Sequence, residues 1–210
     1  HVFNQASLIA NVDYVTVATS TDITDDPIRN FCSNNNIDCV SGPLLQVAER
    51  AALTLQIHKP SIFLRICGDR PLLDPLSHQI AVNQLINLDL DYITSMTHNV
   101  LPSGLTVEVI RSRTFLDKIS QQPSILSNEH FTQALYTDPF LKTDILNIPQ
   151  FDWPDMSFTV DFPSDVSKIE YLLHELARYS SYNNYLERLY HASKSYYLST
   201  HCPVLETIEC

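Results

Sequence analysis

Glycine is scarce in this sequence, where Gly42, Gly68 and Gly104 are the only three among 210 residues. Three isolated glycines cannot form the GxGxxG loop of a dinucleotide-binding domain or the Gly-rich loop of a P-loop NTPase. No serine lies in a GxSxG setting either. The sequence therefore argues against a Rossmann dinucleotide site and against covalent acyl transfer.

Basic residues are also few, since 13 Lys and Arg stand against 24 Asp and Glu, which gives a net charge of -11. A protein that binds nucleic acid neutralises phosphates with many clustered cations. We therefore expect no nucleic acid partner.

Long apolar runs are missing as well. No run approaches the roughly 20 residues that a membrane span requires, and no basic-then-apolar leader opens the chain. We expect no membrane span and a cytoplasmic location.

Cysteine and histidine occur without the spacing of a metal site. The five cysteines form an odd set with no CxxC pair, which suits reduced thiols, although Cys202 and Cys210 could pair. The eight histidines show no HxH or HExxH spacing, so a histidine metal site is not expected.

The pattern that remains is an alternation of short apolar runs with helical periodicity. A chain of 210 residues with 44% hydrophobic content can bury one substantial core. The alternation predicts an α/β domain with a largely parallel sheet. The predicted strands are 14–18, 37–40, 61–67, 91–95, 104–110, 143–148 and 157–160. The predicted helices are one that begins after a cap at Thr24, and 43–58, 75–88, 111–120, 127–137, 165–179 and 180–197.

Two carboxylates follow predicted strands in similar settings. Asp69 leaves a strand through Gly68, and Asp161 follows the sequence SFTV. In open parallel sheets, ligands bind beyond the carboxyl ends of the strands. Magnesium usually takes one or two protein carboxylates, so this pair could hold one Mg²⁺ ion. The alternative is that each aspartate only caps a turn or a helix.

Other charged residues are less specific. Arg65 lies within an apolar strand, so its charge must be paired or must reach the sheet edge. It could meet a phosphate or a substrate carboxylate, or form a structural ion pair with a nearby acid. Arg70 is nearer the expected site but could point to solvent. Taken alone, the positions of Glu108, Glu129 and His130 indicate no particular function.

Seven stretches carry a family resemblance. They are VDYVTVATST (12–21), Gly42 with Glu49 and Arg50, RICGDRPLLDP (65–75), DYITS (91–95), PSGLTVEVI (102–110), NEHFT (128–132) and FTVDFPSDV (158–166). Taken together, they resemble the cytidylyltransferase-like family of spore-coat polysaccharide biosynthesis proteins, and more distantly the enzymes that activate acylneuraminate and 3-deoxy-manno-octulosonate with CTP.

The resemblance implies a GT-A-like (nucleotide-diphospho-sugar transferase) three-layer α/β fold with a mostly parallel sheet. It also implies a reaction in which a sugar oxygen attacks the α-phosphate of CTP and pyrophosphate leaves. The metal ligands for Mg²⁺ would be Asp69 and Asp161. The residues placed near the nucleotide or its phosphates would be Thr19, Ser20, Arg65 and Arg70, and those on the sugar side Gly104, Glu108, Glu129 and His130.

The N-terminal part departs from the family pattern. Family members begin with a strand and a Gly/Arg/Lys-rich loop around the triphosphate, whereas this sequence has no glycine before Gly42 and no lysine before Lys59. Relatives also often have aspartate where Gln46 stands. We expect residues 1–179 to form a nucleotidyltransferase-like domain without that strand and loop, and 180–210 to be a helical extension.

The sequence leaves two other functions open. One is a GT-A-type glycosyltransferase that uses a finished nucleotide sugar, and the other is a non-catalytic sugar-binding relative. Unpaired strand edges would make the isolated chain aggregate or dimerise. In an intact homodimer, we expect the contact within residues 97–149.

Overall fold

The computed structural model describes residues 1–98, 100–127, 131–181 and 184–201. The strands are β1 (Val17–Ser20), β2 (Cys39–Gly42), β3 (Ile62–Leu64), β4 (Tyr92–Thr94), β5 (Glu108–Arg111) and β6 (Thr143–Ile145). The α-helices are α1 (Val2–Ala6), α2 (Asp26–Asn34), α3 (Val47–His58), α4 (Pro75–Asn87), α5 (Ser112–Gln121), α6 (Gln133–Tyr136), α7 (Pro163–Arg178) and α8 (Tyr185–His201). Two short 3-10 helices are η1 (Ile23–Asp25) and η2 (Pro123–Ser127). No helix in these ranges is long and apolar enough to cross a membrane.

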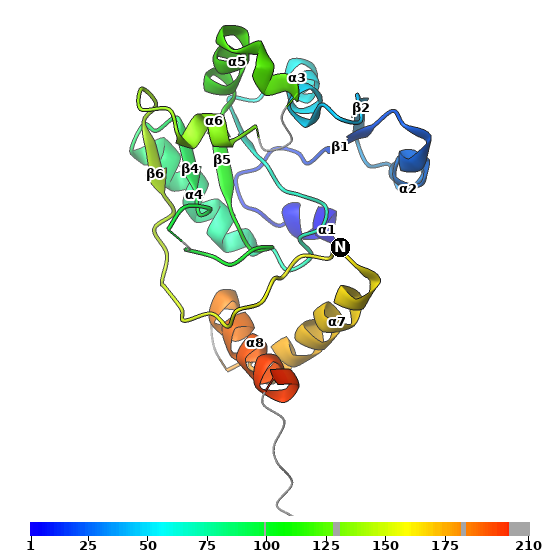
Figure 1. The fold of residues 1–210 in the computed structure, drawn as a ribbon, viewed down its shortest axis with the longest axis vertical. Coiled ribbons are helices and arrows are strands. Elements are labelled where there is room, and N and C mark those ends of the chain that lie inside the picture. Colours follow the sequence, from blue (N-terminus) through cyan, green and yellow to red (C-terminus); the bar gives the residue numbers. More distant parts are fainter. Residues whose placement is uncertain (99, 128–130, 182–183, 202–210) are drawn as a thin grey trace, which may run out of the picture.

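The strands form two sheets rather than one (Figure 1). β1 and β2 pair in parallel, and the second sheet has the order β3-β5-β4-β6. β4 and β6 are parallel, while β5 runs antiparallel to both β3 and β4. The prediction of an α/β fold with parallel strands is confirmed, but the prediction of a mostly parallel sheet is wrong. β4 and β5 are joined without a crossover helix, and such a connection permits antiparallel pairing.

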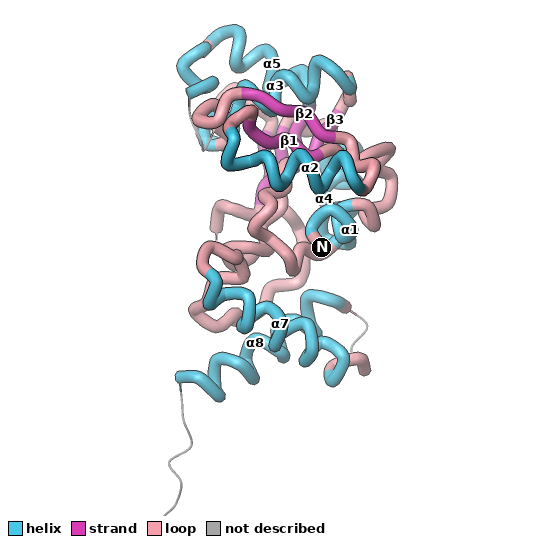
Figure 2. The backbone as a smooth tube through the Cα atoms, turned by 90° about the vertical axis from the view of Figure 1, so that its right-hand side faces the viewer, coloured by secondary structure: helices cyan, strands magenta, loops and turns pink. Residues whose placement is uncertain are grey.

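β1 and β3 are outer strands within the described residues, since β1 pairs with β2 and β3 pairs with β5. Figure 2 shows β1, β2 and β3 at the same end of the molecule. Helix α3 packs on β1 and β2, and its Ala52 belongs to a core cluster that Phe63 of β3 also contacts. Open edges of this kind present unpaired backbone groups. The expected aggregation or dimerisation of the chain stays a prediction.

Two helices begin directly after the loops that carry the predicted metal ligands. Asp74 caps α4, because its carboxylate accepts from the backbone N–H groups of Leu76 (3.2 Å) and Ser77 (3.0 Å). Asp165, in the first turn of α7, accepts from the N–H groups of Asp161 (3.0 Å) and Phe162 (2.9 Å). Both helices start with proline, whose fixed φ suits the first helical turn. These caps fix where each loop ends.

Helix α8 belongs to the main core, although the sequence predicted residues 180–210 as an extension. Leu186, Leu189 and Ala192 are buried in the same cluster as Leu172 of α7 and Val109 of β5. Figure 1 shows α7 and α8 side by side at one end of the molecule. The helix is therefore packed into the domain.

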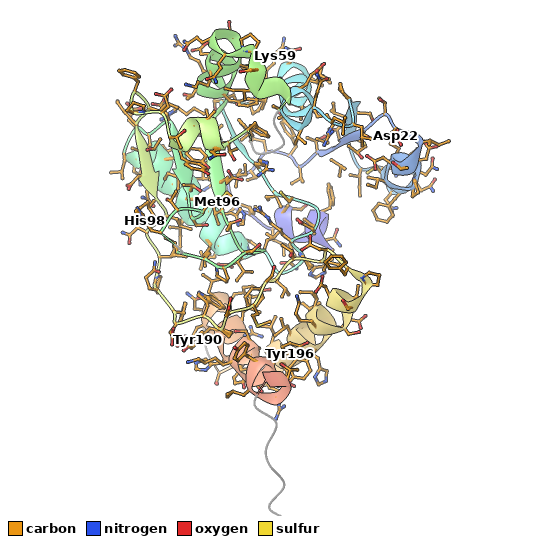
Figure 3. The ribbon with its side chains drawn as sticks, viewed as in Figure 1. Asp22, Lys59, Met96, His98, Tyr190 and Tyr196 are labelled. Atoms are coloured by element: carbon orange, nitrogen blue, oxygen red, sulfur yellow. The ribbon has the colours of Figure 1, made fainter. Side chains whose placement is uncertain are left out.

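An aromatic cluster joins α8 to the segment before α7. Tyr190, labelled on α8 in Figure 3, lies 5.2 Å from the ring of Phe151 and 5.7 Å from that of Trp153. The ring of Trp153 in turn meets that of Phe158 edge-on at 5.6 Å. Aromatic pairs in this geometry stabilise beyond their buried area. The cluster therefore packs against Phe158, which precedes Asp161 by three residues in the sequence.

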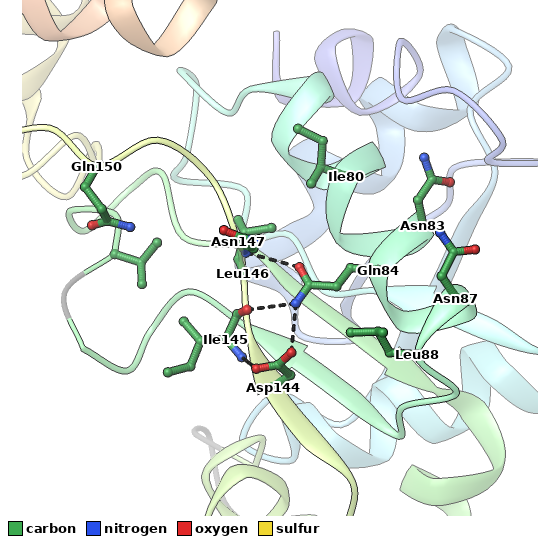
Figure 4. A pocket seen from close by; sticks show the side chains of 11 residues that line it. Ile80, Asn83, Gln84, Asn87, Leu88, Asp144, Ile145, Leu146, Asn147 and Gln150 are labelled. Atoms are coloured by element: carbon green, nitrogen blue, oxygen red, sulfur yellow. Dashed lines mark hydrogen bonds between the residues drawn. The ribbon is translucent and has the colours of Figure 1, made fainter.

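A surface groove of about 660 Å³ runs between α4 and the edge strand β6 (Figure 4). Gln84 crosses it: its amide nitrogen donates to the Ile145 carbonyl (2.9 Å) and the Asp144 carboxylate (3.0 Å), and its oxygen accepts from the Asn147 N–H (3.1 Å). A side chain that bonds to edge backbone groups limits further strand pairing.

Candidate active site

Three loops meet beyond the end of β3. The Val160 N–H donates to the Asp69 carbonyl at 2.9 Å, which places the segment 157–162 against the loop 67–70. The Phe158 N–H donates to the Ser103 carbonyl at 2.8 Å, which adds the loop 102–106. Residues 157–160 were predicted as a strand, but they form no strand in the described structure, and these two backbone bonds join them to the neighbouring loops. The loops of Asp69 and Asp161 are thus neighbours.

Gly104 is the tightest point of this junction. It has φ +90°, and a Cβ atom there would lie 2.3 Å from the carbonyl carbon of Phe158 and 2.6 Å from the nitrogen of Thr159. Only glycine adopts this backbone angle without strain and allows so close an approach. Gly68 differs, because nothing lies within 4 Å of the position that its Cβ would take.

The two glycines give a matched prediction. Gly104→Ala is expected to lower the free energy of unfolding by more than about 2 kcal/mol, because it adds a backbone clash to a strained φ. Gly68→Ala, in open space, is expected to stay within about 0.5 kcal/mol of the wild type. Urea denaturation of both variants measures the difference. Equal stability of the two variants would contradict the close contact at Gly104.

Buried polar atoms without partners gather at the same junction. Among the described residues, Asp69 Oδ1, Arg70 Nε and Thr106 Oγ1 are buried without a hydrogen-bond partner. Arg70 and Thr106 adjoin, because Arg70 Nη1 donates to the Thr106 carbonyl at 3.2 Å. Buried polar groups are normally paired. Asp69 Oδ1 is an acceptor that suits a cation, whereas Arg70 Nε and Thr106 Oγ1 can donate to an anion.

The carboxylates present fit a magnesium ion. The described residues contain no group of three or more His, Cys, Asp or Glu that could hold a metal. Magnesium usually needs only one or two carboxylates and completes its shell with water and phosphate oxygens. Asp69, with its unpartnered oxygen, and the exposed Asp161 on the neighbouring loop would supply two such carboxylates.

Arg65 and Glu108 face each other in the interior. Arg65 Nη1 donates to Glu108 Oε2 at 2.8 Å, and the Tyr92 hydroxyl donates to Glu108 Oε1 at 2.8 Å. Glu108 is fully buried, and the Arg65 guanidinium lies 5.2 Å from the ring centre of Phe131. This geometry gives both residues a structural role, and their predicted phosphate and sugar contacts stay predictions. It is the ion pair that the sequence left open for Arg65.

The ion pair also governs the protonation of its neighbours. Burial by itself lowers the pKa of Arg65, but the Glu108 carboxylate together with Cys67 and Tyr92 more than offsets burial, so the pKa is raised. Burial, followed by the charge of Glu108, also raises the pKa of Tyr92. Arg65 therefore stays charged and Tyr92 stays a hydroxyl donor over the physiological range.

Thr19 and Ser20 lie at the end of β1, in the smaller sheet, and both are buried. The Thr19 hydroxyl and the Ser20 N–H each donate to Asp25 Oδ2 at 2.9 Å. Hydrogen bonds from Ser20 and then Thr19 lower the pKa of Asp25. Within the described residues, no hydrogen bond joins Thr19 or Ser20 to the Asp69 junction. The predicted sugar-side residues Glu129 and His130 lie outside the described residues.

Sequence reasoning missed several residues of the junction. Thr106 and Thr159 are hydroxyl residues within apolar stretches, and Thr159 bonds Asp161 Oδ2 at 2.6 Å. Asp165 holds the backbone of residues 161 and 162. The available signal was the alternation Thr159-Val160-Asp161, which places threonine and aspartate on one face of an extended segment.

Comparison with known proteins finds one curated relative and several solved structures, two of which follow. The chain is 26% identical over 164 residues to the spore coat polysaccharide biosynthesis protein SpsF of Bacillus subtilis (strain 168), covering 76% of this chain and 67% of that protein. A cytidylyltransferase structure from Leptospira borgpetersenii superposes with a TM-score of 0.74 at 14% identity, over 92% of this chain and 82% of that one. The structure of CMP:2-keto-3-deoxy-manno-octonic acid synthetase complexed with CTP gives a TM-score of 0.55 at 15% identity, over 83% and 86%.

The family model for cytidylyltransferases matches residues 1–196, which is nearly the whole sequence. Because the match spans both sheets and α7, it includes the three loops that meet at Asp69. The chain belongs to the cytidylyltransferase family.

Proposed function

We propose that this cytidylyltransferase uses magnesium to transfer CMP from CTP to an acidic sugar for the synthesis of a surface polysaccharide. The observation that carries the proposal is the junction of the Asp69 and Asp161 loops, where the Val160 N–H donates to the Asp69 carbonyl and Asp69 Oδ1 is buried without a partner. Phosphoryl-type transfer depends mainly on positioning and on neutralising charge. Two adjacent carboxylates that can hold a cation suit that requirement.

Each junction residue has a proposed part. Asp69 and Asp161 would hold Mg²⁺, which when bound neutralises phosphate charge and polarises a phosphoryl oxygen. Arg70, whose Nε lacks a partner, would donate to a phosphate oxygen. Gly104 would lie on the sugar side, where its missing side chain lets the loop 102–106 pack against the backbone of Phe158 and Thr159. Thr19 and Ser20 would lie near the nucleotide, at the end of β1.

The names of the relatives support the proposed substrates, which are CTP and an acidic sugar. SpsF is named for spore coat polysaccharide biosynthesis, and the synthetase that superposes on this chain holds CTP and is named for a sugar acid. We therefore propose CTP and a sugar acid as the substrates of this chain, and polysaccharide biosynthesis as its role. We also propose a GT-A-like arrangement of its sheets, a cytoplasmic location and a homodimer.

Pyrophosphate release tests the proposal. The full-length protein, incubated with Mg²⁺, a panel of acidic sugars and one nucleotide at a time, is expected to release pyrophosphate with CTP and one of the sugars. Chelation of Mg²⁺ should stop the release. No pyrophosphate with any nucleotide, or consumption of a nucleotide sugar without pyrophosphate, would count against a cytidylyltransferase that acts on acidic sugars.

A further inference from the structure

The carboxylate of Asp161 is held by a short relay of hydroxyl groups. The Thr159 hydroxyl donates to Asp161 Oδ2 at 2.6 Å, and it lies 2.7 Å from the Ser157 hydroxyl. A carboxylate only accepts hydrogen bonds, so the single hydroxyl hydrogen of Thr159 is committed to Asp161. Ser157 must therefore donate to Thr159. The relay runs in one direction, from Ser157 through Thr159 to Asp161.

The backbone of Asp161 is fixed separately. Its N–H donates to Asp165 Oδ2 at 3.0 Å, and Lys168 holds the other oxygen of Asp165 at 3.1 Å. With the backbone held by Asp165, the side chain of Asp161 still has its own rotamers to choose from. The bond from Thr159 selects one of them. No described residue donates to Asp161 Oδ1, which leaves that oxygen available.

The environment of Thr159 makes this bond strong. Thr159 is only 8% exposed, so water competes weakly for its hydroxyl. A hydrogen bond to an ionised acceptor is shorter and stronger than one between neutral groups. The neighbouring Phe158 is fully buried and is held by the ring of Trp153. Thr159 is therefore on a rigid support, while Asp161 itself is exposed.

We propose that Thr159 is a positioning residue for a divalent cation: its hydroxyl turns Asp161 so that the free oxygen faces a metal ion shared with Asp69. The inference rests on the proposed function, because it assigns the same two carboxylates to the metal. Partners that orient a metal ligand typically contribute about 10- to 100-fold to metal affinity. The competing explanation is that the bond merely stabilises the start of α7.

Two variants separate these explanations. Thr159→Val keeps the shape of the side chain and removes the hydroxyl, whereas Thr159→Ser keeps the hydroxyl. Titration of the full-length protein with Mn²⁺, followed by calorimetry with and without CTP, measures metal binding directly. Valine is expected to weaken Mn²⁺ binding about 10-fold or more, and serine is expected to restore it to within about threefold of the wild type. Thr143→Val, at an exposed site on β6, is the matched control.

The outcomes are distinguishable. If Asp161→Asn abolishes Mn²⁺ binding but Thr159→Val binds as the wild type does, the positioning role is overturned and the metal site stands. If the wild type binds no Mn²⁺, or if Asp69→Asn and Asp161→Asn bind it unchanged, the proposed metal site itself fails. Urea denaturation of each variant shows whether it is folded. A loss of stability in both Thr159 variants without weaker Mn²⁺ binding would leave only the structural explanation.

Discussion

Asp69→Asn and Asp161→Asn are each expected to lower the rate of pyrophosphate release by roughly 10³-fold, since the metal contributes several kcal/mol of charge stabilisation in the transition state. Asparagine has nearly the same shape as aspartate but no charge, so the loops should keep their arrangement. The backbone bond between Val160 and Asp69 does not involve either side chain. The change therefore tests the charge alone.

The measurement is an initial rate at several Mg²⁺ concentrations. Higher Mg²⁺ should recover part of the activity, because the remaining carboxylate still binds the ion weakly. Asp155→Asn, an exposed carboxylate in the segment before Asp161, is the control and should stay within about twofold of the wild type. Full activity in either Asp69→Asn or Asp161→Asn would remove that residue from the proposed site.

Glu108→Leu and Arg65→Met should each lower the free energy of unfolding by about 3–5 kcal/mol, because each leaves one buried charge without its partner. The side chain of Arg65 is 17% exposed and that of Glu108 is 0% exposed, so water can compensate little of the loss. Urea denaturation at neutral pH is the measurement.

The double variant, which combines Arg65→Met with Glu108→Leu, is the internal control. With both charges removed, the stability lost should be clearly less than the sum of the two single losses, since no unpaired charge is buried. Tyr92→Phe, which removes only one hydroxyl donor to Glu108, should cost about 1–2 kcal/mol. Single losses that simply add up would show that Arg65 and Glu108 do not interact in solution.

Local patterns in the sequence predicted most helices but not the pairing of the strands. Residues 75–88 were predicted as a helix, and α4 spans Pro75–Asn87, because proline and the cap at Asp74 are local signals. β1 was predicted at 14–18 but spans Val17–Ser20, since polar Thr19 and Ser20 pair with Ser41 and Gly42. The antiparallel direction of β5 depends on contacts between distant segments, which periodicity does not contain.

The residues of the candidate site could also be predicted from the sequence, but the contacts between them could not. Asp69 and Asp161 could be singled out because each follows a predicted strand and precedes a proline. Their adjacency depends on a bond between Val160 and Asp69, 91 positions apart in the sequence, which no local pattern encodes. Arg65 and Glu108 were equally ambiguous: their contact, 43 positions apart, had to be seen before a structural role could be separated from a catalytic one.

The aromatic cluster beneath the junction gives the protein an optical property. The chain has one tryptophan, so all of its indole fluorescence comes from Trp153. The ring of Trp153 meets that of Phe158 edge-on, and the backbone of Phe158 lies against Gly104. The indole N–H of Trp153 is buried without a hydrogen-bond partner. Emission from this ring responds to the polarity around it, so the unlabelled protein carries its own reporter of events beside Asp69 and Asp161.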